Sequence, residues 1–261
     1  MSTKFHIGAK ALHGPIAAYA KRFDLLEVPV TTERPQQRDG HANHANHPNA
    51  SKDTSPSMAT LRRWRKQVPP HFSFSVIGGP ELGKVKAGPL LERELAIALA
   101  AVAALQANCL VLRTPPEVTP SALWRDRLAT LFARFPRDVT HLVWEPSGLW
   151  ETGDAAVTAK QFGVVVAVDA AREPVPAGGI AYVRLRALGE TRSFGESTLE
   201  RVVQSIGPRR DAYVILETDS ALAECKRLRR VAQRSKAAST GGMGRLVRPH
   251  GGIVVRDDEQ E

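Results

Sequence analysis

Charged side chains gather at the ends of several segments that have the composition of buried strands. They are Glu27, Glu145, Asp169, Arg184, Arg186, Glu217 and Asp219. Carboxylates that face arginines can bind a phosphate, hold a metal ion or share acid–base work. Arg184 and Arg186 are two residues apart, so both lie on the same side of an extended strand. If that side faces a pocket, the two guanidinium groups suit an anionic ligand such as a phosphate or a carboxylate.

These residues predict a site with two kinds of role. Glu27, Glu145 and Asp169 are the candidates for catalysis. The candidates for substrate binding are Arg184, Arg186, Glu217 and Trp150. Two alternatives stay open, because Glu27, Glu145 and Arg184 also suit a buried structural ion network and Asp169 also suits a cap on the following turn. Replacement of Arg184 by alanine tests the role of this residue. If Arg184 binds a ligand, the variant loses ligand binding with little change in Tm. If Arg184 is structural, the variant unfolds.

The long polar segment 34–56 contains three histidines at a spacing of three, His41, His44 and His47. Three imidazoles can bind zinc, but the surrounding Ala, Asn and Pro residues give no helical context that would hold them together. We interpret the segment as a flexible loop insertion and predict no metal site from it. The sequence contains no nucleophile elbow, P-loop, zinc-protease helix or paired-cysteine motif, so it identifies no cofactor.

Strand-like and helix-like periodicities alternate along the chain. Strands are predicted at residues 4–8, 25–30, 72–77, 109–113, 141–145, 164–169, 181–186 and 212–217. Helices are predicted at 15–23, 57–67, 90–106, about 119–134, 155–162, 197–206 and 220–234, with Ser57 as the N-cap of the second. Alternation with short connections implies parallel strands. Eight such units predict an α/β fold, a single TIM-type (β/α)8 barrel.

An open, doubly wound sheet is the alternative fold, and it normally carries a Gly-rich ligand-binding turn after its first strand. Residues 8–14 read Gly-Ala-Lys-Ala-Leu-His-Gly, which is not that fingerprint. We therefore predict one barrel domain at residues 1–234, with the loop insertion at 34–56. Residues 235–261 are predicted to form a disordered basic, Gly-rich tail with an acidic end. In such a barrel the C-terminal ends of the strands meet at one mouth, which brings the charged residues together.

Several sequence motifs, taken in order, resemble one family. They are Thr60–Arg65 with Phe72–Val76, Thr114-Pro115-Pro116, Val143–Trp150, Val168-Asp169 with Arg172-Glu173-Pro174, and Ala181–Leu185. Their order and spacing over residues 4 to 230 resemble the YecE-like family, also called domain of unknown function family 72. The resemblance is to the variant with Trp-Glu-Pro rather than Arg-His-Pro in the fifth strand. It implies a TIM barrel, in agreement with the alternation of elements.

The sequence departs from the family pattern at four strand ends. The first strand is followed by residues 9–12, Ala-Lys-Ala-Leu, where the family has an aromatic and polar signature. Residues 30–33, Val-Thr-Thr-Glu, replace Ser-Thr-Phe-Tyr after Glu27, which matches the family's second-strand glutamate. The seventh strand ends Arg-Leu-Arg-Ala instead of Arg-Leu-His-Gly, and Glu217-Thr218 replace paired asparagines in the eighth. The resemblance therefore implies either altered chemistry or a pocket that binds without catalysing.

The composition is typical of a soluble globular protein, with 43% hydrophobic and 24% charged residues. No apolar run is long enough for a transmembrane helix, and the N-terminus lacks the apolar core of a signal peptide. Cys109 and Cys225 have no metal-ligand spacing and suit two reduced thiols. We therefore expect a cytoplasmic protein that does not contact a membrane.

The net charge of +9 is concentrated in two clusters: Arg62, Arg63, Arg65 and Lys66, and then Lys226, Arg227, Arg229, Arg230 and Arg234. Such clusters are commonly solvated helix faces, but they also suit nucleic acid. Two functions follow. The favoured one is an enzyme acting on a small phosphate- or carboxylate-bearing substrate at the barrel mouth, with hydrolysis and isomerisation both left open. The alternative is a catalytically drifted barrel that acts as a binding protein, with nucleic acid as one ligand.

Overall fold

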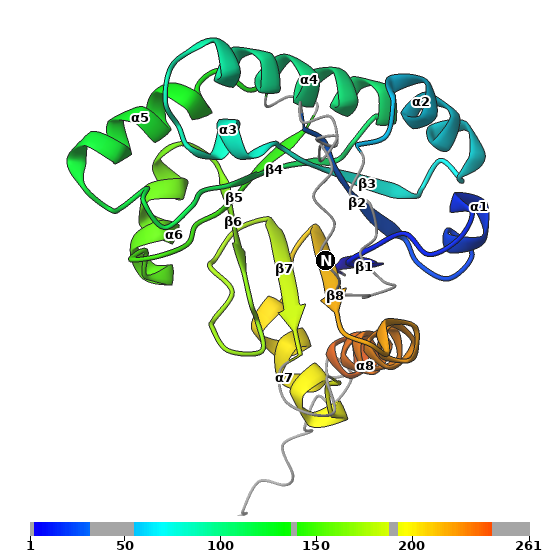
Figure 1. Cartoon of the computed structure of the whole chain (residues 1–261). Helices are drawn as coiled ribbons and strands as arrows, with labels where there is room; N and C mark the ends of the chain where they lie inside the picture. The colour runs from blue at the N-terminus through cyan, green and yellow to red at the C-terminus, as the bar shows by residue number, and fades with distance from the viewer. Residues whose placement is uncertain (1–2, 32–54, 137–139, 188–192, 242–261) are drawn as a thin grey trace, which may run out of the picture.

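Eight parallel strands close into a barrel in which each strand pairs with the next and the last pairs with the first (Figure 1). The computed structural model describes residues 3–31, 55–136, 140–187 and 193–241. The strands are β1 (Lys4–Ala9), β2 (Leu25–Pro29), β3 (Ser73–Ile77), β4 (Cys109–Arg113), β5 (His141–Glu145), β6 (Val165–Val168), β7 (Ile180–Arg186) and β8 (Asp211–Glu217). The predicted TIM-type barrel is confirmed.

Helices surround the barrel on its outside (Figure 1). They are α1 (Ile16–Tyr19), α2 (Met58–Gln67), α3 (Pro80–Gly83), α4 (Pro89–Leu105), α5 (Ala122–Phe132), α6 (Thr152–Gln161), α7 (Glu196–Ile206) and α8 (Ala221–Gly241). Ser57 caps α2 as predicted, because its hydroxyl accepts a hydrogen bond from the backbone N–H of Thr60 at 3.2 Å. The buried residues of α7, Leu199, Val202, Val203 and Ile206, recur at helical spacing and join the hydrophobic core.

Some helix boundaries differ from the sequence prediction. The short helix α3 begins with Pro80 at its first turn, where a Gly-Gly-Pro run had indicated only the end of a strand. Helix α8 continues seven residues beyond the predicted end at Arg234, because residues 235–240 contain no glycine or proline that would end it. Residues 235–241, predicted as the start of a disordered tail, are therefore helical instead. The rest of that predicted tail, residues 242–261, and nearly all of the predicted insertion 34–56, including His41, His44 and His47, lie outside the described residues.

Alternate residues of the strands fill the barrel interior, and the intervening residues pack against the helices. The middle of the interior holds Leu25, Ile77, Cys109, Val111, Val143, Tyr182, Tyr213 and Ile215, all of them buried. Cys109 and Cys225 are both buried and free of disulfide bonds. This apolar and aromatic layer separates the polar N-terminal end of the barrel from its polar C-terminal end.

Polar side chains also line the N-terminal end of the barrel. The two ring nitrogens of His6 lie 2.8 Å from the Ser73 hydroxyl and 3.0 Å from a carboxylate oxygen of Asp211. The His6 ring stacks on Tyr213, with 4.7 Å between the ring centroids. Burial lowers the pKa of His6, and the hydrogen bond with Asp211 only partly opposes this effect. In TIM barrels this end serves stability and the opposite end serves chemistry, so the C-terminal mouth is where a site is expected.

Candidate functional site

One guanidinium group lies at the centre of the C-terminal mouth, between three carboxylates. Arg184, on β7, donates hydrogen bonds to Glu27 on β2, to Glu145 on β5 at 2.9 Å and to Glu217 on β8 at 2.6 Å. The side chains of Arg184 and Glu27 are only 2% and 1% exposed, and those of Glu145 and Glu217 are 13% exposed. Four strands that are distant in sequence therefore meet in one buried ion network.

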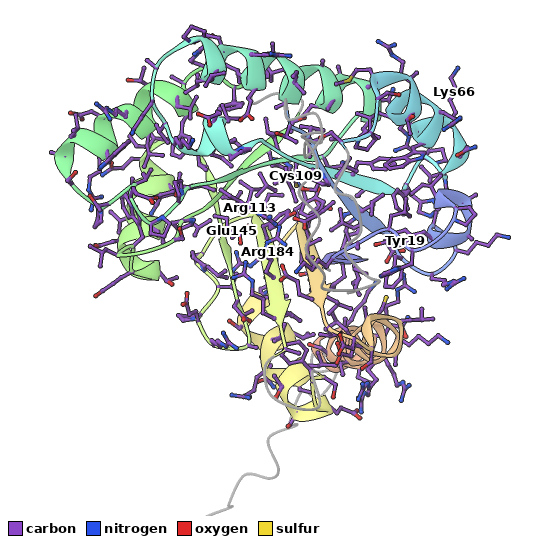
Figure 2. All side chains as sticks on the ribbon, viewed as in Figure 1. Tyr19, Lys66, Cys109, Arg113, Glu145 and Arg184 are labelled. Carbon is purple, nitrogen blue, oxygen red and sulfur yellow. The ribbon has the colours of Figure 1, made fainter. Side chains whose placement is uncertain are left out.

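Two further arginines cover this network on the solvent side. Arg113 lies at the end of β4, and its Nε is 2.9 Å from Glu145 Oε2. Arg186 donates to the other oxygen of Glu145, and its Nε is 3.4 Å from Glu217 Oε2. The side chains of Arg113 and Arg186 are both 45% exposed, so each can also reach a ligand. Figure 2 shows Arg113, Glu145 and Arg184 directed toward one another at the centre of the barrel.

Arg113 was not among the residues predicted from the sequence. It is two residues after Val111 and four after Cys109, both of which lie in the barrel interior, so the strand alternation alone places it inside. Its backbone is held by α3, because a Cβ on Gly83 would lie only 2.0 Å from the carbonyl oxygen of Arg113. Glycine at position 83 thus lets α3 press against the end of β4 that carries this arginine.

A hydroxyl chain supports the network from below. Tyr182 donates a hydrogen bond to Glu27, and the Tyr182 oxygen lies 2.9 Å from the Ser75 hydroxyl. Tyr182 and Ser75 are fully buried, on β7 and β3. Burial raises the pKa of Tyr182 well above its ordinary value, and the negative charge of Glu27 adds to this shift, so the phenol stays protonated and available as a donor. Sequence reasoning missed both residues, which carry no charge to draw attention to them.

The electrostatics of the network favour the charged forms of Glu145 and Arg184. Burial pushes the pKa of Glu145 upward, but the charges of Arg184, Arg113 and Arg186 outweigh burial and leave that pKa below its ordinary value. Burial works against the charge of Arg184 as well, yet Glu27 and Glu145 raise its pKa overall. A carboxylate that is ionised and saturated with donors is a poor proton carrier near neutral pH. The arrangement is therefore better suited to fixing geometry and field than to exchanging protons.

Asp169 differs from the three glutamates. It follows β6, and its Oδ1 accepts a hydrogen bond from the backbone N–H of Ala171 at 3.1 Å, which is the turn cap that the sequence also suggested. Its Oδ2 is buried and is the only such side-chain oxygen or nitrogen without a hydrogen-bond partner in the part of the chain that the structure describes. The nearest cation, Arg172 Nε, is 3.7 Å from Oδ2, too far for a hydrogen bond. Burial raises the pKa of Asp169 above its ordinary value.

A small cavity of about 170 Å³ lies over this carboxylate. Its charged and polar lining comprises Glu145, Thr152, Asp169, Arg172, Glu173, Arg184 and Arg186. Trp150 forms part of its wall: the indole N–H donates to the carbonyl of Val118 at 2.6 Å, and the ring packs edge-on against Trp144. The cavity thus combines Asp169, whose pKa is raised, with two half-exposed arginines, Arg172 and Arg186.

A larger cavity of about 680 Å³ lies on the other side of Arg186. It is bounded by the segment after β1, by α1, by the end of β8 and by the start of α8. Its polar lining includes Lys10, His13, Arg22, Arg186, Glu217, Thr218 and Asp219. Because Arg186 and the network border both cavities, the mouth has two compartments that share one arginine.

The structure brings all seven predicted site residues to the C-terminal mouth. Glu27, Glu145, Arg184, Arg186 and Glu217 form one contiguous network, and Asp169 and Trp150 line the small cavity beside it. Whether these residues bind or turn over a substrate stays a prediction. Across the described ranges, no group of three or more His, Cys, Asp or Glu side chains is arranged to hold a metal ion. The three glutamates instead converge on the guanidinium of Arg184.

A closed (β/α)8 barrel with a charged C-terminal mouth defines the class of protein as a TIM barrel. The family model described as "Protein of unknown function DUF72" matches residues 49–245, and the chain belongs to this family. It is the YecE-like family that the sequence motifs resembled, so that identification is confirmed. Two of the departures from the family pattern, after β1 and after β2, precede the matched segment, and so does Glu27. Among curated proteins, none matches the sequence.

Solved structures agree with this assignment. A DUF72 family protein from Enterococcus faecalis is 13% identical with a TM-score of 0.62, and the alignment covers 88% of this chain and 96% of that one. A DUF72 family protein from Thermotoga maritima is 15% identical with a TM-score of 0.58, covering 90% and 99%. A xylose isomerase domain containing protein from Salmonella typhimurium is 17% identical with a TM-score of 0.53, covering 90% and 97%. At these identities the likeness establishes the fold alone.

Neither the family nor the fold assigns a reaction. The family is described as one of unknown function, and the TIM barrel supports many unrelated chemistries. Among the described helices, none is both long enough and apolar enough to cross a membrane. The function must therefore be argued from the mouth itself.

Proposed function

We propose that this protein is an enzyme that performs acid–base chemistry on a small phosphate- or carboxylate-bearing substrate at the C-terminal mouth of the barrel. The observation that carries the proposal is the buried Oδ2 of Asp169, which lacks a hydrogen-bond partner among the described residues, on a side chain that lines the small cavity. A buried polar atom without a partner costs free energy. Such a cost is expected where a substrate group completes the hydrogen bonding.

Asp169 is the proposed proton carrier. A general acid or base works best when its pKa lies near the working pH, and burial moves the pKa of Asp169 in that direction. The glutamates have different proposed roles. Glu27, Glu145 and Glu217 each accept a hydrogen bond from Arg184, so they orient the arginines and set the field in the mouth. Of the three residues predicted to be catalytic, Asp169 is thus the one that we place in contact with the reacting group.

The anionic part of the substrate is proposed to bind Arg186 and Arg172. Both guanidinium groups line the small cavity and are about half exposed, so they can donate to a phosphate or carboxylate without first leaving the protein interior. Thr152 and Glu173 add a hydroxyl and a carboxylate to the same lining. Hydroxyl groups of a substrate match these side chains, and the wall formed by Trp150 limits its size. A hydroxylated small molecule with one phosphate or carboxylate group therefore fits best.

The test is an NMR screen of the whole protein in D2O with a panel of sugar phosphates and sugar acids. Isomerisation introduces deuterium at carbon, and hydrolysis releases a new product, so one measurement reports both reactions. With a substrate found by the screen, Asp169→Asn should lower kcat by about 10²-fold or more. Arg186→Gln should raise KM instead. Asp154→Asn, on the exposed side of α6, is the matched control and should leave both constants unchanged.

Two results would contradict the proposal. The first is full turnover by Asp169→Asn, which would show that the proton carrier lies elsewhere. The second is a compound of the panel that binds in the mouth and raises Tm but is not converted at any pH between 5 and 9. That result would identify a barrel that binds without catalysing, which is the alternative function considered from the sequence.

A further inference from the structure

Two helices account for the net positive charge of the chain. Helices α2 and α8 together contain ten basic residues and one acidic residue, a difference of +9 that equals the net charge of the whole chain. The acidic residue, Glu224, is buried and accepts hydrogen bonds from the Phe194 backbone and from Thr218, so it does not face solvent. All the remaining charges of the chain cancel one another.

Closure of the barrel brings these two helices to the same side. Strand β1 pairs with β2 on one edge and with β8 on the other, so the helices that follow β8, β1 and β2 are consecutive around the barrel. In Figure 1, α2, α1 and α8 follow one another down the right-hand side. The Cys225 thiol of α8 donates to the carbonyl of Arg22, just after α1, at 3.7 Å. Helices separated by about 160 residues thus flank the same short helix α1.

Some basic side chains on this side are already engaged within the protein. Arg65 donates to the carbonyls of Pro69 and Phe72, Arg229 pairs with Asp24 at 2.7 Å, and Arg234 pairs with Glu196. Seven others are exposed, and their side chains form no hydrogen bond or ion pair with the described residues: Lys21, Arg22, Arg62, Arg63, Lys66, Lys226 and Arg230. We call this set the basic flank. Lys66 shows its character, because it extends from α2 away from the barrel (Figure 2).

We propose that the basic flank binds the phosphate backbone of a nucleic acid. Phosphates spaced along a strand match a row of separate cations, and arginine, which supplies four of the seven residues, contacts phosphate through two parallel hydrogen bonds. An anionic membrane is the weaker candidate. Helices that lie on membranes insert large apolar side chains, and the exposed large apolar residues of the described chain, Leu90, Leu123, Leu149 and Val157, all lie outside α1, α2 and α8.

This surface goes beyond the proposed enzyme activity, although the two adjoin. Arg22 belongs to the basic flank and also lines the larger cavity of the mouth. Among the described residues of α1, α2 and α8, no Phe, Tyr or Trp ring is exposed, so neither stacking of bases nor recognition of sequence is expected. Binding should depend on charge alone and weaken steeply with salt.

The test is fluorescence anisotropy of the full chain with a labelled 20-residue DNA duplex and an RNA strand of the same length, at 50 to 300 mM salt. The wild type should bind both at low salt. The logarithm of its association constant should fall linearly with the logarithm of the salt concentration. The triple variant Arg62→Gln, Arg63→Gln, Lys66→Gln should bind about tenfold or more weakly and reduce the duplex slope by up to about three. Lys226→Gln with Arg230→Gln should act in the same direction.

The matched control changes the same number of charges elsewhere. Lys86, Arg93 and Lys160 are exposed before α4, on α4 and on α6, and their triple replacement by glutamine should leave affinity and slope close to those of the wild type. Glutamine has a helix propensity similar to that of arginine and lysine, so Tm should change little in either variant. The proposal is wrong if low-salt binding is absent, if the control weakens it equally, or if vesicles with anionic lipid bind while both oligonucleotides do not. Asp169→Asn should not alter the anisotropy, which keeps this result separate from the enzyme proposal.

Discussion

Arg184 and Glu27 form an ion pair at the centre of the barrel mouth, with side chains that are 2% and 1% exposed. Neither charge would be tolerated at that depth without the other. The pair connects β7 to β2 across the barrel, and Glu145 and Glu217 attach β5 and β8 to the same guanidinium. The network therefore connects four strands at the C-terminal end of the barrel and fixes the arginines that face the mouth.

Replacement of Arg184 by alanine should therefore destabilise the fold. The variant leaves three carboxylates in a buried layer without their central cation, and removal of one partner from a buried pair typically costs about 3–5 kcal/mol. Chemical denaturation should show a loss of that size in the free energy of unfolding. This is the structural outcome that the sequence had left open for Arg184→Ala, rather than a loss of ligand binding at constant Tm.

Two variants serve as controls for this effect. Arg184→Lys retains the charge but cannot reach three carboxylates at once, so it should lose less stability than alanine. Arg186→Gln removes a half-exposed arginine and should cost about 1 kcal/mol or less. If Arg184→Ala were no less stable than Arg186→Gln, the buried network would not support the fold in this way.

Asp169 should make the stability fall as the pH rises. Its pKa is raised in the folded protein, so the folded state binds more protons than the unfolded state between the ordinary pKa of 3.8 and the raised value. Stability from this group is present at acid pH and is lost as pH rises through the folded pKa. Asp169→Asn removes this loss, so the stability difference between variant and wild type should grow in favour of the variant from pH 4 to pH 7. Denaturant titrations at several pH values measure it, and a constant difference would argue against a raised pKa.

His6 should make the stability fall as the pH falls, which is the opposite of the effect of Asp169. Burial lowers its pKa, while Lys4 adds to this effect and Asp211 and Asp24 oppose it. Below the ordinary value of 6.5 the unfolded state therefore binds a proton that the folded state refuses, and stability is lost as pH falls. In His6→Gln the fall in stability between pH 7 and pH 5 should be shallower than in the wild type. The absolute stability also changes, because Ser73 and Asp211 lose their partner, so the slope is the deciding quantity. An unchanged slope would mean that His6 titrates normally.

Much of this structure was predictable because strand parity determines what faces inward. The alternation of elements predicted the barrel, and the spacing of Arg184 and Arg186 predicted that both lie on the same side of their strand. Arg113 obeys the same parity with Cys109 and Val111, so the sequence contains the information that places it in the barrel interior. The character of Asp169 could not be predicted, because an unpartnered Oδ2 depends on how β6, Arg172 and the neighbouring loops pack. Nor does sequence order indicate that α2 and α8 flank the same side, since only barrel closure brings them there.

Replacement of glycine by alanine should destabilise the protein at position 83 and stabilise it at position 153. A Cβ at Gly83 would lie 2.0 Å from the carbonyl oxygen of Arg113, a backbone atom that can move only with β4. Gly83→Ala should therefore cost about 1–3 kcal/mol, as overpacking does, and shift Arg113 relative to Glu145. At Gly153, in the first turn of α6, a Cβ would meet no atom within 4 Å. Gly153→Ala should stabilise by about 0.5–1 kcal/mol, because alanine restricts the unfolded chain and favours the helix. Thermal and denaturant unfolding of the two variants decide the matter, and equal effects would show that the contact between α3 and β4 is looser than the structure indicates.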